Sequence, residues 1–271
     1  MKTRCLLFLL LLILITLPSL ISLIVTSEAA GETDQSKNIE DPEEYNRLVQ
    51  IAEDILTRLH KKPLQNREGV SQAVTKGLTI LQELLKTDKK HAQDLGFLID
   101  KGTIEEILKG AKLRAYPVFE IHLNDLRAFS PESDVKQLLI YTDQILFSIG
   151  VDKEAQTSLT IRFTHNEQDG TEQKRGTITW RPTRWGRPNL IRQITNAQDK
   201  LATQNPDLKP GFLVSIPSLN KNFLGYKEKT DIKLVPLSND HLLTKGESYL
   251  AEDVFTWLSA EAKSVDDDNP R

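Results

Sequence analysis

Cysteine is nearly absent from this sequence, because the only one, Cys5, lies close to the N-terminus. The chain beyond it therefore has no disulfide, no thiol nucleophile and no cysteine ligand for a metal. The sequence also contains no Asn-x-Ser/Thr glycosylation site. These absences indicate a protein that depends on its apolar core for stability, and a bacterial envelope protein is the simplest interpretation.

Motifs that carry catalysis are missing as well. The sequence has no His-Glu-x-x-His, no Gly-x-Ser-x-Gly and no glycine loop that binds phosphate. The five histidines lie far apart, and no two have the spacing of metal ligands on a helix. We therefore expect a protein without catalytic residues, metal or cofactor. The alternative is a hydrolase whose active site is assembled from scattered residues.

The N-terminus combines two cations with a long uncharged apolar stretch. Lys2 and Arg4 precede Cys5–Val25, which carries no charge and is long enough for a membrane span of about 20 residues. Pro18 divides this stretch and leaves a shorter apolar core that is typical of a cleaved signal. Residues 1–29 are thus a signal peptide or a signal-anchor helix. Both alternatives place the rest of the chain outside the cytoplasm, in the periplasm or an equivalent lumen, secreted or anchored to the membrane.

The period of the apolar residues divides the exported part. Residues 30–41 are polar and form a tether. Residues 42–112 carry apolar stripes at helical spacing, which predicts a small helical bundle. Residues 113–263 alternate apolar and polar side chains and predict an α+β domain, and residues 264–271 form an acidic disordered tail. The fold class that we expect is α+β, with helices first and an antiparallel sheet after them.

Alternating runs mark the strands of the second part. The clearest are Phe119–Leu123, Leu159–Phe163, Ile178–Trp180, Phe212–Ile216 and Ile232–Val235. The second and third are expected to form an antiparallel hairpin around Asp169 and Gly170. Helices that begin at Pro188 and Glu247 are expected to cover the sheet. The pattern of Gln137–Val151 fits a helix or strands, and the alternation of its apolar residues favours strands.

Cations gather in one segment, although the formal net charge of the chain is only −3 and excludes a general polyanion binder. Between Lys174 and Arg192 there are six cations and no acid. Arginines spaced by three, together with prolines, predict a polyproline-like path, which has three residues per turn and places the guanidiniums on one side. The segment runs into a helix start, where backbone amides favour an anion. The predicted ligand-binding residues are Arg181, Arg184, Trp185, Arg187 and Asn189.

The same segment also fits a structural role. Trp180 alternates with the residues of a strand and is expected in the core, and Trp185 would hold the loop against the sheet. The arginines would then pair with acids of the helical part. In that case the protein is an extracytoplasmic scaffold or an assembly factor similar to a chaperone.

In the binding alternative the protein is a non-enzymatic envelope protein. Its partner would be an anionic small molecule, a lipid headgroup, a wall polymer or an acidic protein. If the N-terminal segment is not cleaved, the membrane is a further partner. Nucleic acid is not expected as a partner in that compartment.

Two short stretches resemble a known family. Tyr116–Ile121, and Asn196–Leu201 with the Asn205-Pro206 pair that follows, are similar to segments of the protein-import components of cyanobacteria and chloroplasts. The resemblance covers none of the helical N-terminal part. It implies a periplasmic or lumenal assembly factor.

Overall fold

The computed structural model describes residues 42–87, 112–150, 156–165, 178–205, 208 and 211–265. The predicted signal or anchor (1–29), the tether (30–41) and the later helices of the predicted bundle lie outside these residues. So do the Asp169-Gly170 turn and residues 266–271 of the acidic tail. Within the described ranges, no helix is both long enough and apolar enough to cross a membrane.

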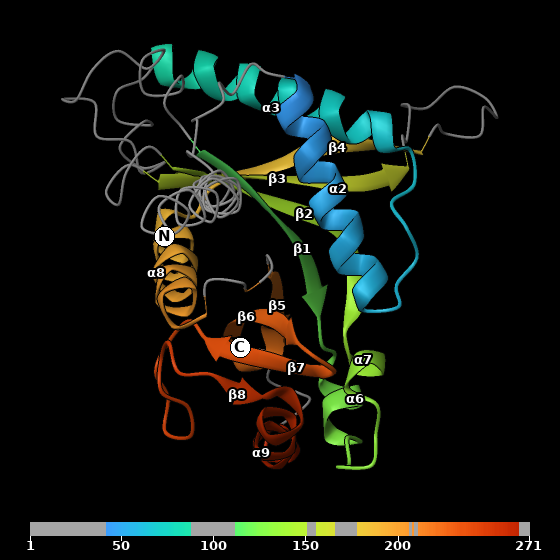
Figure 1. Cartoon of the computed structure of the whole chain (residues 1–271), viewed down its shortest axis with the longest axis vertical. Helices are drawn as coiled ribbons and strands as arrows, with labels where there is room; N and C mark the ends of the chain where they lie inside the picture. Colours follow the sequence, from blue (N-terminus) through green and yellow to red (C-terminus); the bar gives the residue numbers. More distant parts are fainter. Residues whose placement is uncertain are drawn as a thin grey trace, which may run out of the picture. The chain divides into compact units, whose positions relative to one another are not determined.

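Eight strands form one mixed sheet in the order β4-β3-β2-β1-β5-β6-β7-β8 (Figure 1). They are β1 (Lys112–Glu120), β2 (Ile140–Gly150), β3 (Gln156–His165), β4 (Ile178–Gly186), β5 (Phe212–Ile216), β6 (Lys221–Glu228), β7 (Asp231–Pro236) and β8 (Tyr249–Leu250). The α+β prediction is confirmed. The prediction of an antiparallel sheet is wrong at the central pair, since β1 and β5 are parallel. Three antiparallel pairings in succession make β4 run opposite to β1. The chain reverses once more through α8, so β5 runs in the direction of β1.

The helices cover both faces of this sheet. They are α2 (Pro42–Arg58), α3 (Arg67–Thr87), α6 (Leu123–Arg127), α7 (Val135–Leu138), α8 (Pro188–Gln204) and α9 (Ala251–Lys263), with a 3-10 turn, η2 (Pro217–Leu219). Side chains of α2, α3 and α9 join one apolar cluster with the sheet, and those of α8 join a second cluster. Strand residues alternate between the clusters, as Leu213 and Val214 do. The two clusters therefore lie on opposite faces.

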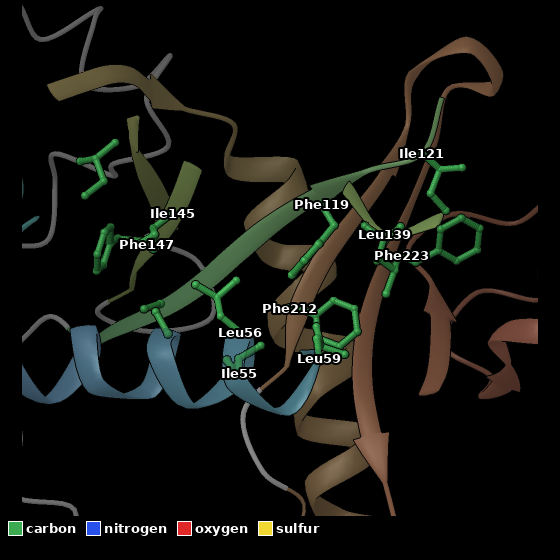
Figure 2. Close-up of a cluster of buried hydrophobic side chains, with 14 of the residues drawn as sticks. Ile55, Leu56, Leu59, Phe119, Ile121, Leu139, Ile145, Phe147, Phe212 and Phe223 are labelled. Carbon is green, nitrogen blue, oxygen red and sulfur yellow. The ribbon is translucent and has the colours of Figure 1, made fainter. Parts of the chain in front are cut away.

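Helices α2 and α3 share their core with the sheet. The predicted stripe of α2, which includes Leu48, Ala52 and Leu59, is buried as expected. Figure 2 shows Leu59 of α2 beside Phe212 of β5, within the cluster that also contains Phe119 of β1. At the C-terminal end of α2, the ammonium group of Lys227 donates a hydrogen bond to the carbonyl oxygen of Arg58 across 3.4 Å. Helix α2 and the sheet therefore share one apolar core.

Two predicted boundaries shift. Strand β1 ends at Glu120 and α6 begins at Leu123, because alternation over a few residues does not separate a strand end from a short helix. Helix α8 begins at Pro188 as predicted, but α9 begins at Ala251, four residues beyond Glu247, because β8 pairs with β7 first.

The ambiguous segment Gln137–Val151 forms a short helix, α7, followed by strand β2, which confirms strands for most of it. The register of β2 against β1 is irregular, because Pro117 lies opposite Ile145 whereas Phe119 lies opposite Tyr141. Asp143, inside this irregularity, has a left-handed backbone with φ of 54°, which Asp tolerates better than most residues. Pro117 has no N–H for the ladder, so a bulge at this place is expected.

Candidate functional site

Strand β4 places its tryptophans on one face because its pairing with β3 contains a bulge. Trp180 and Trp185 are five residues apart and would point to opposite faces of a regular strand. Opposite β3, however, Thr160 lies across from Arg184 and Ile161 from Pro182, so β4 has one additional residue, Thr183. The prediction of a polyproline-like path is therefore wrong: the segment is an edge strand, where a bulge and a proline are tolerated.

Both tryptophans contact helix α3 or the loop before it. The indole N–H of Trp180 donates to the carbonyl oxygen of Gln65 across 2.8 Å, and that of Trp185 donates to the carbonyl oxygen of Gly77 across 3.1 Å. A Cβ atom at Gly77 would lie 2.7 Å from the methyl groups of Leu159, so only glycine lets α3 approach β3 this closely. Trp180 is buried, as the structural alternative predicted, whereas Trp185 is itself part of β4 and contacts α3 instead of holding a loop against the sheet.

The opposite face of the sheet carries a groove with a volume of about 520 Å³. Val118, Leu146 and Leu213 contribute buried apolar surface from the three central strands. The same three residues belong to the apolar cluster of α8, so the groove lies on the face that α8 partly covers. Its polar lining comes from Glu120, Gln144, Thr160, Arg162, Thr183, Arg184, Arg187, Ser215, Asn220 and Asn222.

Three guanidiniums line this groove, those of Arg162, Arg184 and Arg187. Partial burial and the positive charge of Arg184 lower the pKa of Arg187. The two guanidiniums are therefore near enough to repel one another. Between the residues that the structure describes, no ion pair joins any of the three arginines to a carboxylate. The predicted pairing of Arg184 and Arg187 with acids of the helical part is thus not seen there.

Arg187 occupies a strained position at the start of α8. It is the N-cap residue and has a left-handed backbone with φ of 64°, which a residue other than glycine adopts at a cost. No side chain caps the helix, so the amides of Asn189 and Leu190 have no acceptor within the helix. The amide of Ile191 donates to the carbonyl oxygen of Arg187 and is therefore already satisfied.

The remaining predicted residues lie outside the groove. Arg181 lies opposite Arg162 in the register of β4 against β3. It borders a hollow of about 470 Å³ between β4 and α3. Trp185 borders the same hollow. Asn189 is exposed, and its side-chain oxygen accepts a hydrogen bond from Arg192 across 2.5 Å. Two of the five predicted ligand-binding residues, Arg184 and Arg187, therefore line the groove.

The sequence analysis missed Arg162, Gln144 and the polar residues of β5 and β6. Arg162 had a weak signal, because it alternates with the apolar residues Ile161 and Phe163 and so belongs on the face away from α3. Its neighbours in space depend on a strand register that alternation does not reveal.

In the part of the chain that the structure describes, no group of three or more His, Cys, Asp or Glu residues is arranged to hold a metal ion. No protein-family model matches this chain, and no curated protein or solved structure matches it either. The resemblance to import components therefore stays a prediction from two short segments.

Proposed function

We propose that this is a non-enzymatic envelope protein that binds an anionic ligand in the groove lined by Arg162, Arg184 and Arg187. One observation carries the proposal: three guanidiniums border one groove, and none of them forms an ion pair with a described carboxylate. Arginine forks bind carboxylate and phosphate oxygens in pairs, with more geometric selectivity than lysine. An anion between these side chains would also offset the repulsion that lowers the pKa of Arg187.

The compartment is part of the same proposal. Residues 1–29 have the charge and apolar pattern of an export signal or signal anchor. The domain would then meet anions of the envelope: small molecules, lipid headgroups, wall-polymer fragments or an acidic protein. The polar lining of the groove, with three amide side chains and several hydroxyls, favours a hydrophilic ligand over an acyl chain.

Thermal unfolding of the full chain in inorganic phosphate tests the proposal, with ionic strength held constant by NaCl because exposed charges are screened by salt. Phosphate should raise the Tm of the wild type, since a ligand at 100 times its Kd stabilises by about 2.7 kcal/mol. The Arg184→Gln variant should lose most of that increase. Arg192→Gln is the matched control, because Arg192 belongs to α8 but does not line the groove. An equal increase in both variants contradicts the proposal.

An extracytoplasmic scaffold or assembly factor, in which the arginines are structural, is the second candidate, and the edge position of β4 favours a structural role for them. Strand β4 lies at the edge of the sheet and contains Pro182, a bulge and several cations. These features prevent an edge strand from pairing with another chain. In that case Arg184→Gln should leave the phosphate response unchanged and should increase self-association, which light scattering measures.

A further inference from the structure

The groove contains a carboxylate as well as three guanidiniums. Glu120, the last residue of β1, lines it and is half-buried. Among the residues that the structure describes, Glu120 forms no ion pair with the arginines of the groove. A ligand with negative charge along its whole length would meet this carboxylate and be repelled. The groove therefore presents both signs of charge to whatever binds in it.

The strand order sets the distance between the two kinds of charge. Arg162 lies on β3 and Glu120 on β1, with β2 between them (Figure 1). Neighbouring strands are about 4.8 Å apart, so these two backbones are separated by roughly 10 Å across the sheet. Gln144 of β2 is the register partner of Arg162 and also lines the groove. The register partner of Glu120 on β2 is Ile140, so Glu120 is also displaced along the strands and its separation from Arg162 exceeds the distance across the sheet.

Neutral polar groups continue the groove on the far side of β1. Ser215 of β5 and Asn222 of β6 are register partners and both line it. Amide side chains both donate and accept hydrogen bonds, and a hydroxyl does the same. These groups suit peptide units or other neutral amides. They add no charge to the pattern made by the arginines and Glu120.

We infer that the ligand is dipolar: a short peptide with free termini, whose carboxylate binds Arg162, Arg184 and Arg187 and whose ammonium group lies at Glu120. This inference rests on the proposed function, because it uses the same arginines. The two charges of a single α-amino acid are too close together to reach both walls. An extended residue spans about 3.3–3.6 Å, so a peptide of two or three residues covers the distance. The volume of about 520 Å³ lies in the range of small-ligand sites.

Calorimetric titration of the full chain with trialanine tests this. The free peptide is compared with its N-acetylated form and its C-terminal amide, and inorganic phosphate serves as the reference anion. Acetylation should weaken binding to the wild type about fivefold, the size expected for one partly solvated ion pair. In Glu120→Gln, acetylation should make no difference, because the partner of the ammonium group is already gone. Phosphate should bind Glu120→Gln more tightly than the wild type. Amidation, or Arg184→Gln, should weaken peptide binding at least about tenfold.

Two results overturn the inference in distinguishable ways. If the acetylated and free peptides bind the wild type equally, or if Glu120→Gln binds every probe more tightly, the ligand is not dipolar and the anion groove stands alone. If neither phosphate nor the peptide binds, or if Arg184→Gln has no effect on any probe, the proposed function is wrong and the inference falls with it.

Discussion

On the face of β4 that packs against α3, each tryptophan donates its indole N–H to a backbone carbonyl, whereas on the opposite face Arg184 and Arg187 border a groove. Trp180 is buried and its ring lies 5.3 Å from that of Phe163 between centroids. The indole N–H groups of the first face are satisfied within the fold, whereas Arg184 and Arg187 on the second form no ion pair with a described carboxylate. Hence one short strand combines a stabilising face with a face whose arginines are exposed to solvent.

The groove arginines, which form no ion pair among the described residues, also differ from two lysines of the other half of the sheet. Lys221 of β6 is nearly buried, and its ammonium group lies 2.5 Å from a carboxylate oxygen of Asp240 and 3.3 Å from one of Glu261. Lys233 is 2.7 Å from a carboxylate oxygen of Glu228. These two lysines are each paired with a carboxylate within the fold. This contrast supports a separate role for the groove arginines.

The largest loss of stability is expected on the face of β4 that carries the tryptophans. Trp180→Ala removes a buried ring and leaves the carbonyl of Gln65 without its donor, so the free energy of unfolding should fall by about 3–5 kcal/mol. Arg184→Ala, on the other face of the same strand, should change it by less than about 0.5 kcal/mol. Urea denaturation of both full-length variants measures the difference. Equal losses would show that the two faces do not differ in the way described.

An intermediate loss of stability is expected when Lys221 loses the nearer of its two carboxylate partners. Asp240→Asn removes the partner of Lys221 and should lower the free energy of unfolding by about 1–3 kcal/mol at pH 7. Burial alone would raise the pKa of Asp240, but hydrogen bonds from Lys221 and from the amides of Leu242 and Leu243 outweigh it and hold the pKa below its usual value of 3.8. The charged form is therefore favoured in the native state. Its contribution is complete above pH 3.8 and disappears as the pH falls through the lowered native pKa.

Denaturation at a series of pH values checks the direction in which the contribution of Asp240 to stability changes with pH. The difference between the wild type and Asp240→Asn should shrink below pH 3.8. The exposed Asp231 provides the control, since Asp231→Asn should have little effect at any pH. A difference between wild type and Asp240→Asn that stays constant down to strong acid would exclude the charged pair as its source.

The smallest effect on stability has the opposite sign. Arg187→Gly relieves a left-handed backbone and removes a charge that Arg184 repels, so the chain should gain about 0.5–1 kcal/mol. The same variant should lose much of its response to phosphate. Arg187→Ala separates the two causes, because it removes the charge but keeps the strain. If Arg187→Gly is less stable than Arg187→Ala, backbone strain at this position is not a cost of the site.

The parts of the fold that sequence patterns predicted are those that local periodicity controls. The stripe of α2, the start of α8 at Pro188 and the strand character of β3, β5 and β7 all follow from side chains within one element. The candidate site was predicted only in part. Arg184 and Arg187 stand out because cations are concentrated near them, while Arg162 and Glu120 look like ordinary polar positions of exposed strand faces.

By itself, the sequence determined the apolar stripe of α2, the start of α8, the strand character of β3, β5 and β7, and where the cations concentrate, because these depend on neighbours along the chain. Only the tertiary structure decided that β5 lies beside β1, that one additional residue in β4 brings both tryptophans onto α3, and that Arg162 and Glu120 share a groove. The physical reason is that strand order and register depend on pairings between distant segments. A shift of one residue in register moves every side chain to the other face.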